Sequence, residues 1–236
     1  MYKRILLKLS GESLMGSKQY GIDEVRLAEY AQQIKEVAEL GVQIGIVIGG
    51  GNICRGAVQA KVGFDRVSGD YMGMLSTVIN ALAVSSTLEQ KGVKTTVFSA
   101  LGKVSDRVKE YNPDDANVDL SEGKVCFFAG GIGKPYFTTD TGAATRAVET
   151  KCEAILMGKH GVDGVYDKDP NKYEDAKRFD ELSFDDILRL NLQVIDRQAA
   201  ELCAEYKIGA FVFNMSDKDN IIKAVKNEAV GTIIKF

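Results

Sequence analysis

Three consecutive glycines, Gly49 to Gly51, follow an apolar β-branched run and precede Arg55. Glycines leave backbone N–H groups exposed and let a ligand approach the main chain closely. A concave row of N–H donors suits an anion, above all a phosphate, and an arginine adds a bidentate donor for phosphate oxygens. A tight strand-to-helix turn without a ligand accounts for these glycines about as well. The choice between a phosphate site and a plain turn therefore depends on other segments of the chain.

Three further segments carry similar residues directly after expected strands. Lys8 lies in an apolar run that ends at Ser10 and Gly11. Residues 129–140 hold three glycines, a lysine and two threonines before Asp140, and residues 158–170 read GKHGVDGVYDKDP. A lysine such as Lys8 is more often an edge or snorkelling residue, but before Ser-Gly it can also point at a phosphate. Several such turns on one sheet edge predict a site that holds two phosphorylated groups face to face.

The two best-known phosphate-binding motifs are absent from the sequence. G-x-x-x-x-G-K-[ST] fails because Lys134 precedes Pro135 and Phe128 stands at the first glycine. G-x-G-x-x-G fails because Cys54 stands at the last glycine. A P-loop NTPase and a nicotinamide dehydrogenase are therefore not supported. A single histidine and four widely spaced cysteines without a CxxC pair argue against the usual zinc sites and against a Ser-His-Asp or Cys-His hydrolase.

The composition is that of an ordinary globular protein. The chain has 236 residues, 45% of them apolar and 27% charged, which suffices for one large core. The net charge is −3 and the lysines and arginines are scattered, so we expect no nucleic-acid binding. We also expect no membrane span, because no apolar stretch approaches the ~20 residues required. The cysteines read as reduced thiols, so the expected location is the cytoplasm.

Alternating strands and helices are predicted along the chain. Residues 3–9 and 42–48 read as buried strands, and 23–40 between them has helical spacing with Asp23 as N-cap. Further helices are expected at 69–90, 140–151, 183–190, 196–206 and 218–227, and further strands at 93–99, 124–129, 154–157, 209–214 and 231–235. Residues 161–182 read as a hairpin or loop excursion, and the acidic residues Asp114, Asp115, Asp119 and Glu122 as a solvated loop.

This alternation predicts an α/β fold, specifically a three-layer αβα sandwich with a mostly parallel central sheet. We expect one domain over residues 1–236. Ligands of such open sheets bind at the carboxyl ends of the strands, which is where the glycine clusters fall.

Five motifs, in order, resemble those of the bacterial uridylate (UMP) kinases of the amino-acid-kinase superfamily. They are KLSGE at 8–12, VIGGGNICRG at 47–56, GDYMGML at 69–75, GIGKPYFTTD at 131–140 and VDGVYDKDP at 162–170. The resemblance covers essentially the whole chain. It implies transfer of the ATP γ-phosphoryl group to UMP, giving UDP for CTP and UTP biosynthesis. It further implies Mg²⁺ held through the ATP phosphates, and a homohexamer built from dimers.

The resemblance also implies roles for residues at matching positions. The acceptor part would span about 1–150 and the ATP-binding part about 151–236. ATP would contact Lys8, Leu9, Ser10, Gly11, Gly51, Arg55, His160, Tyr166 and Asp169. UMP would contact Gly50, Asp70, Ile132, Gly133, Lys134, Pro135, Tyr136, Phe137, Thr138 and Thr139. A region that binds the activator GTP in some members matches Gly16, Ser17, Lys18, Gln19, Tyr20 and Gly21, and UTP is a further candidate effector. His160 departs from the usual Thr or Asn, and Lys134 from the expected Asn or other polar residue.

The expected chemistry needs no general base. A nucleoside monophosphate has a second pKa near 6, so its oxygen is already an anionic nucleophile at neutral pH. The remaining barrier is the repulsion of two polyanions, which cations and N–H donors relieve. Lys8 and Arg55 are the predicted catalytic cations. We hypothesise that Asp140 and Asp196 orient Lys8 or, through water, the metal, although each could instead be only a helix N-cap.

Two other functions remain open on the sequence. A kinase of the same superfamily could phosphorylate an amino-acid carboxylate, as aspartate or acetylglutamate kinases do, but Asp70 and the FTTD segment favour a ribonucleotide acceptor. A non-catalytic storage or sensor protein could share the fold, but intact Lys8, Arg55 and Asp140 argue against it.

Overall fold

A computed structural model describes residues 1–54, 63, 65–159, 161–217, 219–228 and 230–236. In that part of the chain, nine strands form one sheet in the order β4-β3-β5-β2-β1-β6-β10-β11-β9. Their bounds are β1 Arg4–Leu9, β2 Gln43–Ile48, β3 Thr95–Ser99, β4 Lys109–Glu110, β5 Val125–Ala129, β6 Ala154–Lys159, β9 Glu181–Ser183, β10 Gly209–Asn214 and β11 Gly231–Lys235.

The chain order changes direction at β1, which pairs in parallel with β2 on one side and with β6 on the other. β5 continues the parallel sheet beyond β2, and β10 continues it beyond β6, while β11 runs antiparallel to β10. The carboxyl ends of β5, β2, β1, β6 and β10 therefore meet at one edge. A ligand crevice is expected there, where the strand order reverses.

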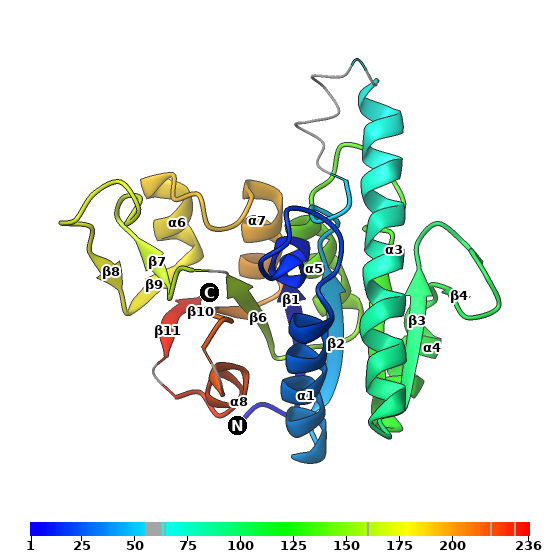
Figure 1. Cartoon of the computed structure of the whole chain (residues 1–236). Coiled ribbons are helices and arrows are strands. Elements are labelled where there is room, and N and C mark those ends of the chain that lie inside the picture. The colour runs from blue at the N-terminus through cyan, green and yellow to red at the C-terminus, as the bar shows by residue number, and fades with distance from the viewer. Residues whose placement is uncertain (55–62, 64, 160, 218, 229) are drawn as a thin grey trace.

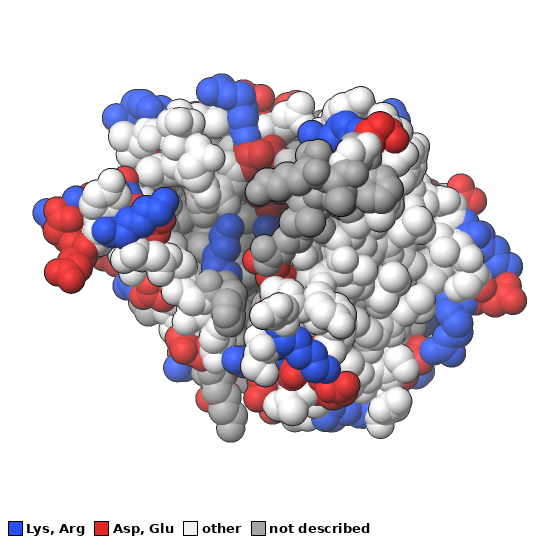
Figure 2. Space-filling model, turned by 45° about the horizontal axis from the view of Figure 1, so that its top comes forward, with Lys and Arg blue, Asp and Glu red and all other residues white. Residues whose placement is uncertain are grey.

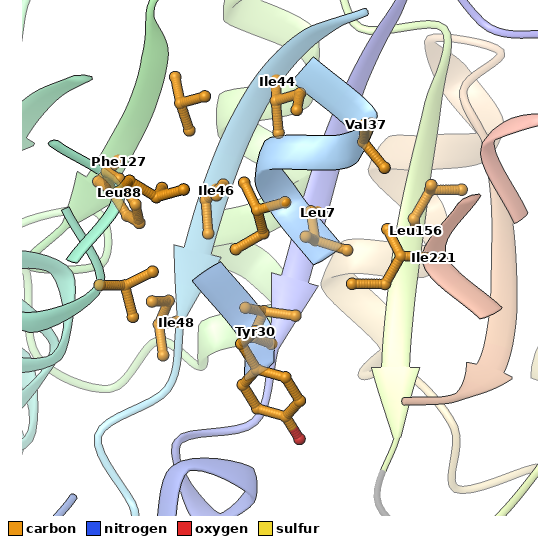
Figure 3. Close-up of a cluster of buried hydrophobic side chains, with 14 of the residues drawn as sticks. Leu7, Tyr30, Val37, Ile44, Ile46, Ile48, Leu88, Phe127, Leu156 and Ile221 are labelled. Carbon is orange, nitrogen blue, oxygen red and sulfur yellow. The ribbon is translucent and has the colours of Figure 1, made fainter. Parts of the chain in front are cut away.

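Helices cover both faces of the sheet, which confirms the predicted three-layer sandwich (Figure 1). One face packs against α1 (Glu24–Glu39), α3 (Arg66–Gln90) and α8 (Asn220–Val225). Figure 3 shows part of this core, with Tyr30 and Val37 of α1 and Ile221 of α8 beside Leu7 of β1. The opposite face packs against α4 (Pro113–Ser121), α5 (Thr139–Glu149), α6 (Phe184–Leu190) and α7 (Arg197–Glu205).

The first βαβ unit has the bounds that its sequence predicts to within one residue. The Asp23 carboxylate accepts hydrogen bonds from the N–H groups of Val25 and Arg26, both at 3.0 Å, so α1 begins there. Gly41 has φ +80°, which ends the helix at little steric cost. The predicted excursion at 161–182 is a hairpin, in which β7 (Val165–Tyr166) pairs with β8 (Arg178–Phe179).

One expectation was wrong. Asp114, Asp115 and Asp119 belong to α4 and Glu122 is its C-cap, so these residues do not form a solvated loop. Asn112 caps the helix, and Ala116 and Leu120 pack against the sheet. Asp119 is buried there and forms an ion pair with Lys124 at 2.5 Å. A short 3-10 helix, η1 (Gly11–Met15), also follows β1 where no helix was expected.

The expectation that no apolar stretch approaches membrane-spanning length needs a correction at α3. By length and composition this helix of 25 residues is apolar enough to cross a bilayer. Half of its most apolar window is buried inside the protein, as in the core helix of a soluble protein, so the feature is weak evidence for a membrane. Serine, threonine, asparagine and glycine interrupt its apolar residues, which is why the sequence pattern concealed it.

Candidate active site

Two cavities open at the carboxyl edge of the sheet, on either side of the end of β1. The larger has a volume of about 710 Å³ and lies between Lys8, the end of β6, the β7 hairpin and residues 190–194. The smaller, of about 290 Å³, lies between the glycine turn after β2, α3 and residues 131–139. Figure 2 looks onto this edge, where a hollow in the middle of the face has both basic and acidic side chains at its floor.

Strand alternation places Lys8 in the larger cavity. Ile5, Leu7 and Leu9 point to the α1 face of the sheet, so Lys8 lies on the face that α5 covers. Asp140 stands in the first turn of α5, and its Oδ1 is 2.7 Å from Lys8 Nζ. The two side chains retain only 14% and 18% of their accessible surface. A largely buried cation is therefore held by one carboxylate at the strand end, as the orientation hypothesis for Asp140 requires.

Asp196 does not join this pair directly. It is the N-cap of α7, where its Oδ1 accepts from the Ala199 N–H at 2.9 Å. Its Oδ2 accepts from the hydroxyls of Thr138 and of Thr141, the latter at 3.0 Å. Because Thr138 is itself the N-cap of α5, Asp196 ties the starts of α5 and α7 together beside Asp140. Asp196 is therefore a helix N-cap, as the alternative interpretation held, and it also links the two helix starts. Asp140 is not a helix cap.

The glycine turns after β1 and β2 lie against each other. A Cβ added to Gly11 would stand 2.2 Å from the Gly49 carbonyl oxygen, so the close approach requires glycine. Two buried asparagines hold the second turn. Asn80 of α3 donates to the Gly49 carbonyl at 2.8 Å and to Asn52 Oδ1 at 2.7 Å. This pair fixes the turn after β2 against α3.

Asp70 is engaged at the mouth of the smaller cavity. Both carboxylate oxygens lie 2.8 Å from Arg66 Nε, and Oδ2 accepts from the Tyr136 N–H at 2.6 Å. Arg66 also lies over the Tyr136 ring, with its guanidinium carbon 5.4 Å from the centroid. Asp70 therefore anchors the loop that the sequence assigns to UMP, in addition to lining the cavity.

A buried arginine supports the same loop from below. Arg146 of α5 donates to the Gly131 carbonyl at 3.0 Å and to Glu149 at 2.6 Å, and stacks 3.7 Å above the Tyr111 ring. Burial, together with the Tyr111 hydrogen bond to Glu149, raises the pKa of the Tyr111 hydroxyl. The glycine-rich loop that begins at Gly131 is therefore held in place by the buried Arg146.

The β7 hairpin forms the outer wall of the larger cavity. The Tyr166 hydroxyl donates to Asp163 at 2.6 Å, and Arg178 donates to the other oxygen of Asp163 at 2.6 Å. Asp169 accepts from the Asn171 N–H at 3.0 Å, which closes the turn before Pro170. Tyr166 and Asp169 are therefore positioned by the hairpin itself.

Most of the sequence-predicted residues fall into the two cavities. Those lining the larger one are Lys8, Ser10, Tyr166 and Asp169. Those lining the smaller one are Gly50, Gly51, Asp70, Ile132, Lys134, Phe137, Thr138 and Thr139. Gly51, predicted for ATP, thus lines the smaller cavity. Among the described residues, those predicted for the site that do not line either cavity are Leu9, Gly11, Gly133, Pro135, Tyr136, Asp140 and Asp196.

Other predictions lie elsewhere. Residues 16–21 form a surface segment outside both cavities, with Tyr20 80% exposed, although the Gly21 N–H donates to the Asn52 carbonyl at 2.8 Å. Arg55 and His160 lie outside the described residues. Sequence reasoning missed Lys159, at the end of β6, which lines the larger cavity with Lys8. A lysine at the end of an apolar strand before a glycine-containing turn, the same signal as for Lys8, could have found it.

No group of three or more His, Cys, Asp and Glu side chains in the described part of the chain could hold a metal ion by itself. Mg²⁺ commonly keeps several waters and is bound through one or two carboxylates together with substrate phosphates. Asp140 and Asp196, at the starts of α5 and α7, fit that requirement.

A parallel sheet whose strand ends carry two cavities and two adjacent glycine turns is suited to hold two phosphorylated groups. The chain belongs to the amino acid kinase family, whose model matches residues 3–214. It is 51% identical to the uridylate kinase of Parabacteroides distasonis over 99% of this chain and 98% of that protein. It is 47% identical to the uridylate kinase of Limosilactobacillus reuteri over 99% of this chain and 97% of that protein.

Solved structures agree with this assignment. The UMP kinase from Bacillus anthracis superposes with a TM-score of 0.96 at 36% identity, covering 99% of this chain and 96% of that one. The UMP kinase from Ureaplasma parvum gives 0.94 at 37% identity, with full coverage of both chains. The family resemblance inferred from the five motifs is therefore confirmed.

Proposed function

We propose that this protein is a UMP kinase that transfers the γ-phosphoryl group of ATP to UMP, giving UDP for pyrimidine nucleotide synthesis in the cytoplasm. The observation that carries the proposal is the placement of the two cavities on either side of the Lys8–Asp140 pair. ATP occupies the larger cavity and UMP the smaller. This assignment agrees with an acceptor part at 1–150 and an ATP part at 151–236, except that Lys8, Ser10 and Glu12 also line the larger cavity.

In this reaction the protein supplies position and charge. The UMP phosphate oxygen attacks the γ-phosphorus directly, because it is already ionised at neutral pH. Lys8 Nζ, held by Asp140, neutralises charge on the transferred group, and the glycine turn after β2 lets phosphate oxygens approach its backbone closely. Arg55 is the proposed second cation of this crevice. Asp140 and Asp196 would hold Mg²⁺ through water beside the ATP phosphates, and the metal would add further charge neutralisation.

An assay of ADP release separates this function from its rivals. The purified protein is incubated with ATP, Mg²⁺ and one acceptor at a time: UMP, CMP, aspartate or acetylglutamate. We expect turnover with UMP and none with the two amino acids. Turnover with aspartate or acetylglutamate alone would identify an amino-acid kinase. Nucleotide binding without any UMP turnover would instead indicate a storage or sensor protein.

The proposed contact of Asp70 with UMP gives a specific prediction. Asp70→Asn should raise KM for UMP about tenfold or more and change KM for ATP little, because a hydrogen bond to a charged group contributes about 1.5–3 kcal/mol. Steady-state kinetics with each substrate varied measure both constants. Arg66→Gln is the matched control, because it removes the partner of Asp70 and keeps the carboxylate. If it raised KM for UMP equally, Asp70 would act only by anchoring the loop.

We further propose that the protein assembles into a homohexamer built from dimers, with α3 at the dimer contact. Along α3, Val67, Tyr71, Leu75 and Ile79 recur every four residues and are 37%, 41%, 45% and 51% exposed. In Figure 2 a broad face with few charged residues lies over this helix. Such a stripe on one side of a helix favours burial against another copy.

Leu75→Glu should therefore shift the protein to a smaller species in size-exclusion chromatography with light scattering. A carboxylate buried in an apolar contact loses its hydration without gaining a partner. Val118→Glu is the control, since Val118 is 55% exposed on α4, away from this stripe. An unchanged mass for the Leu75 variant would exclude α3 from the interface. Residues 16–21 remain the proposed effector region, which adding GTP or UTP to the assay tests.

A further inference from the structure

Lys159 lies at the end of β6 on the same face of the sheet as Lys8. Lys8 pairs with Met157 in the register of β1 and β6, and Lys159 follows Met157 by two residues. Since side chains alternate along a strand, Met157 and Lys159 point to one face. Both lysines line the larger cavity. The donor side of the crevice therefore holds two ammonium groups on adjacent strands.

No carboxylate in the described part of the chain forms an ion pair with the ammonium group of Lys159. Its Nζ donates to the Val194 carbonyl oxygen at 3.1 Å. Burial and then the charge of Lys8 lower the pKa of Lys159, and Asp140 opposes this effect. An ammonium that is largely desolvated and has no direct ion-pair partner is costly, so its retention beside a cavity indicates that the cavity receives an anion.

We propose that Lys159 binds the phosphate chain of the donor nucleotide, as a second cation beside Lys8. The proposal rests on the proposed function for the identity of that nucleotide. The ammonium is within reach of the same space as Lys8, and a polyphosphate supplies the counter-charge that Val194 cannot. The hydrogen bond to Val194 also connects β6 to the residues that precede Asp196, so Lys159 links the phosphate site to the start of α7.

Equilibrium binding by calorimetry tests this role separately from catalysis. ATP, inorganic triphosphate and AMP are titrated into the wild-type protein, Lys159→Gln and Lys159→Arg. Glutamine removes the charge but can still donate to the Val194 carbonyl. We expect Lys159→Gln to raise Kd for ATP and triphosphate about tenfold or more, since charge-assisted contacts to phosphate are strong, and to leave Kd for AMP unchanged. Lys159→Arg should retain most of the affinity.

Lys235→Met is the control for loss of a surface lysine, because Lys235 is 59% exposed and pairs with Glu181 far from the cavity. Equal losses for ATP and AMP in the glutamine variant would mean that Lys159 only supports the cavity wall, and unchanged affinity for ATP would exclude the contact. Either result overturns the proposal. Triphosphate binding that depends on Lys159 without any UMP turnover would refute the kinase function and leave this inference standing.

Discussion

Lys8→Met is expected to lower kcat by about a thousandfold or more, because it removes the cation placed at the end of the central strand. Donors directed at charge that develops in a transition state contribute about 10²–10³ in kcat each, and the transferred phosphoryl group is a site of concentrated negative charge. Methionine keeps the length and apolar contacts of the lysine stem. Single-turnover kinetics at saturating ATP and UMP measure the loss at the chemical step.

The variant also leaves Asp140 without its partner, so a loss of folding must be distinguished from a loss of chemistry. Breaking one side of a largely buried ion pair destabilises a protein more than replacing both members. The double variant Lys8→Met/Asp140→Asn should therefore recover thermal stability and remain inactive. If Lys8→Met kept turnover within a few fold of the wild-type protein, the phosphate role of this lysine would be wrong.

The position of Lys8 shows how far the sequence determines the site. Strand periodicity alone places Lys8 opposite the core-facing Leu7 and Leu9, and the parallel βαβ order brings the strand ends to one edge. The turn signals also locate the glycine segments. Local patterns of this kind are enough to predict the fold and the location of the crevice.

Contacts between distant segments could not be predicted in the same way. The support of Gly131 by Arg146, and the engagement of Asp70 by the Tyr136 N–H, depend on how α5 and α3 pack on the sheet. The sequence of each helix gives its amphipathic face but not its partners across the crevice. Residues 113–121 were misread because their acidic composition was weighed above the Asn112 cap and Pro113, which fix a helix start.

The packing of the two glycine turns suggests two roles for the glycines of the site. Some allow two backbone segments to lie in contact, and others leave room for the ligand. Gly11 and Gly51 separate these roles. Neither has a positive φ, so a substitution at either position acts through space and not through backbone strain. A Cβ on Gly11 would meet the Gly49 carbonyl oxygen at 2.2 Å and Asn52 Oδ1 at 2.6 Å. A Cβ on Gly51 would meet nothing nearer than Glu12, at 3.4 Å.

Gly11→Ala should therefore destabilise the protein by about 3 kcal/mol, because neither the Gly49 backbone nor the buried Asn52 can yield without separating the turns. Its activity should fall with its stability. Gly51→Ala should unfold at nearly the wild-type denaturant concentration and yet lose activity, since its methyl group stands where phosphate oxygens approach the N–H row. Urea unfolding and kcat/KM for both substrates measure the two effects. Full activity in Gly51→Ala would mean that the turn after β2 is only a strand connection, and normal stability in Gly11→Ala would mean that the two turns can move apart freely.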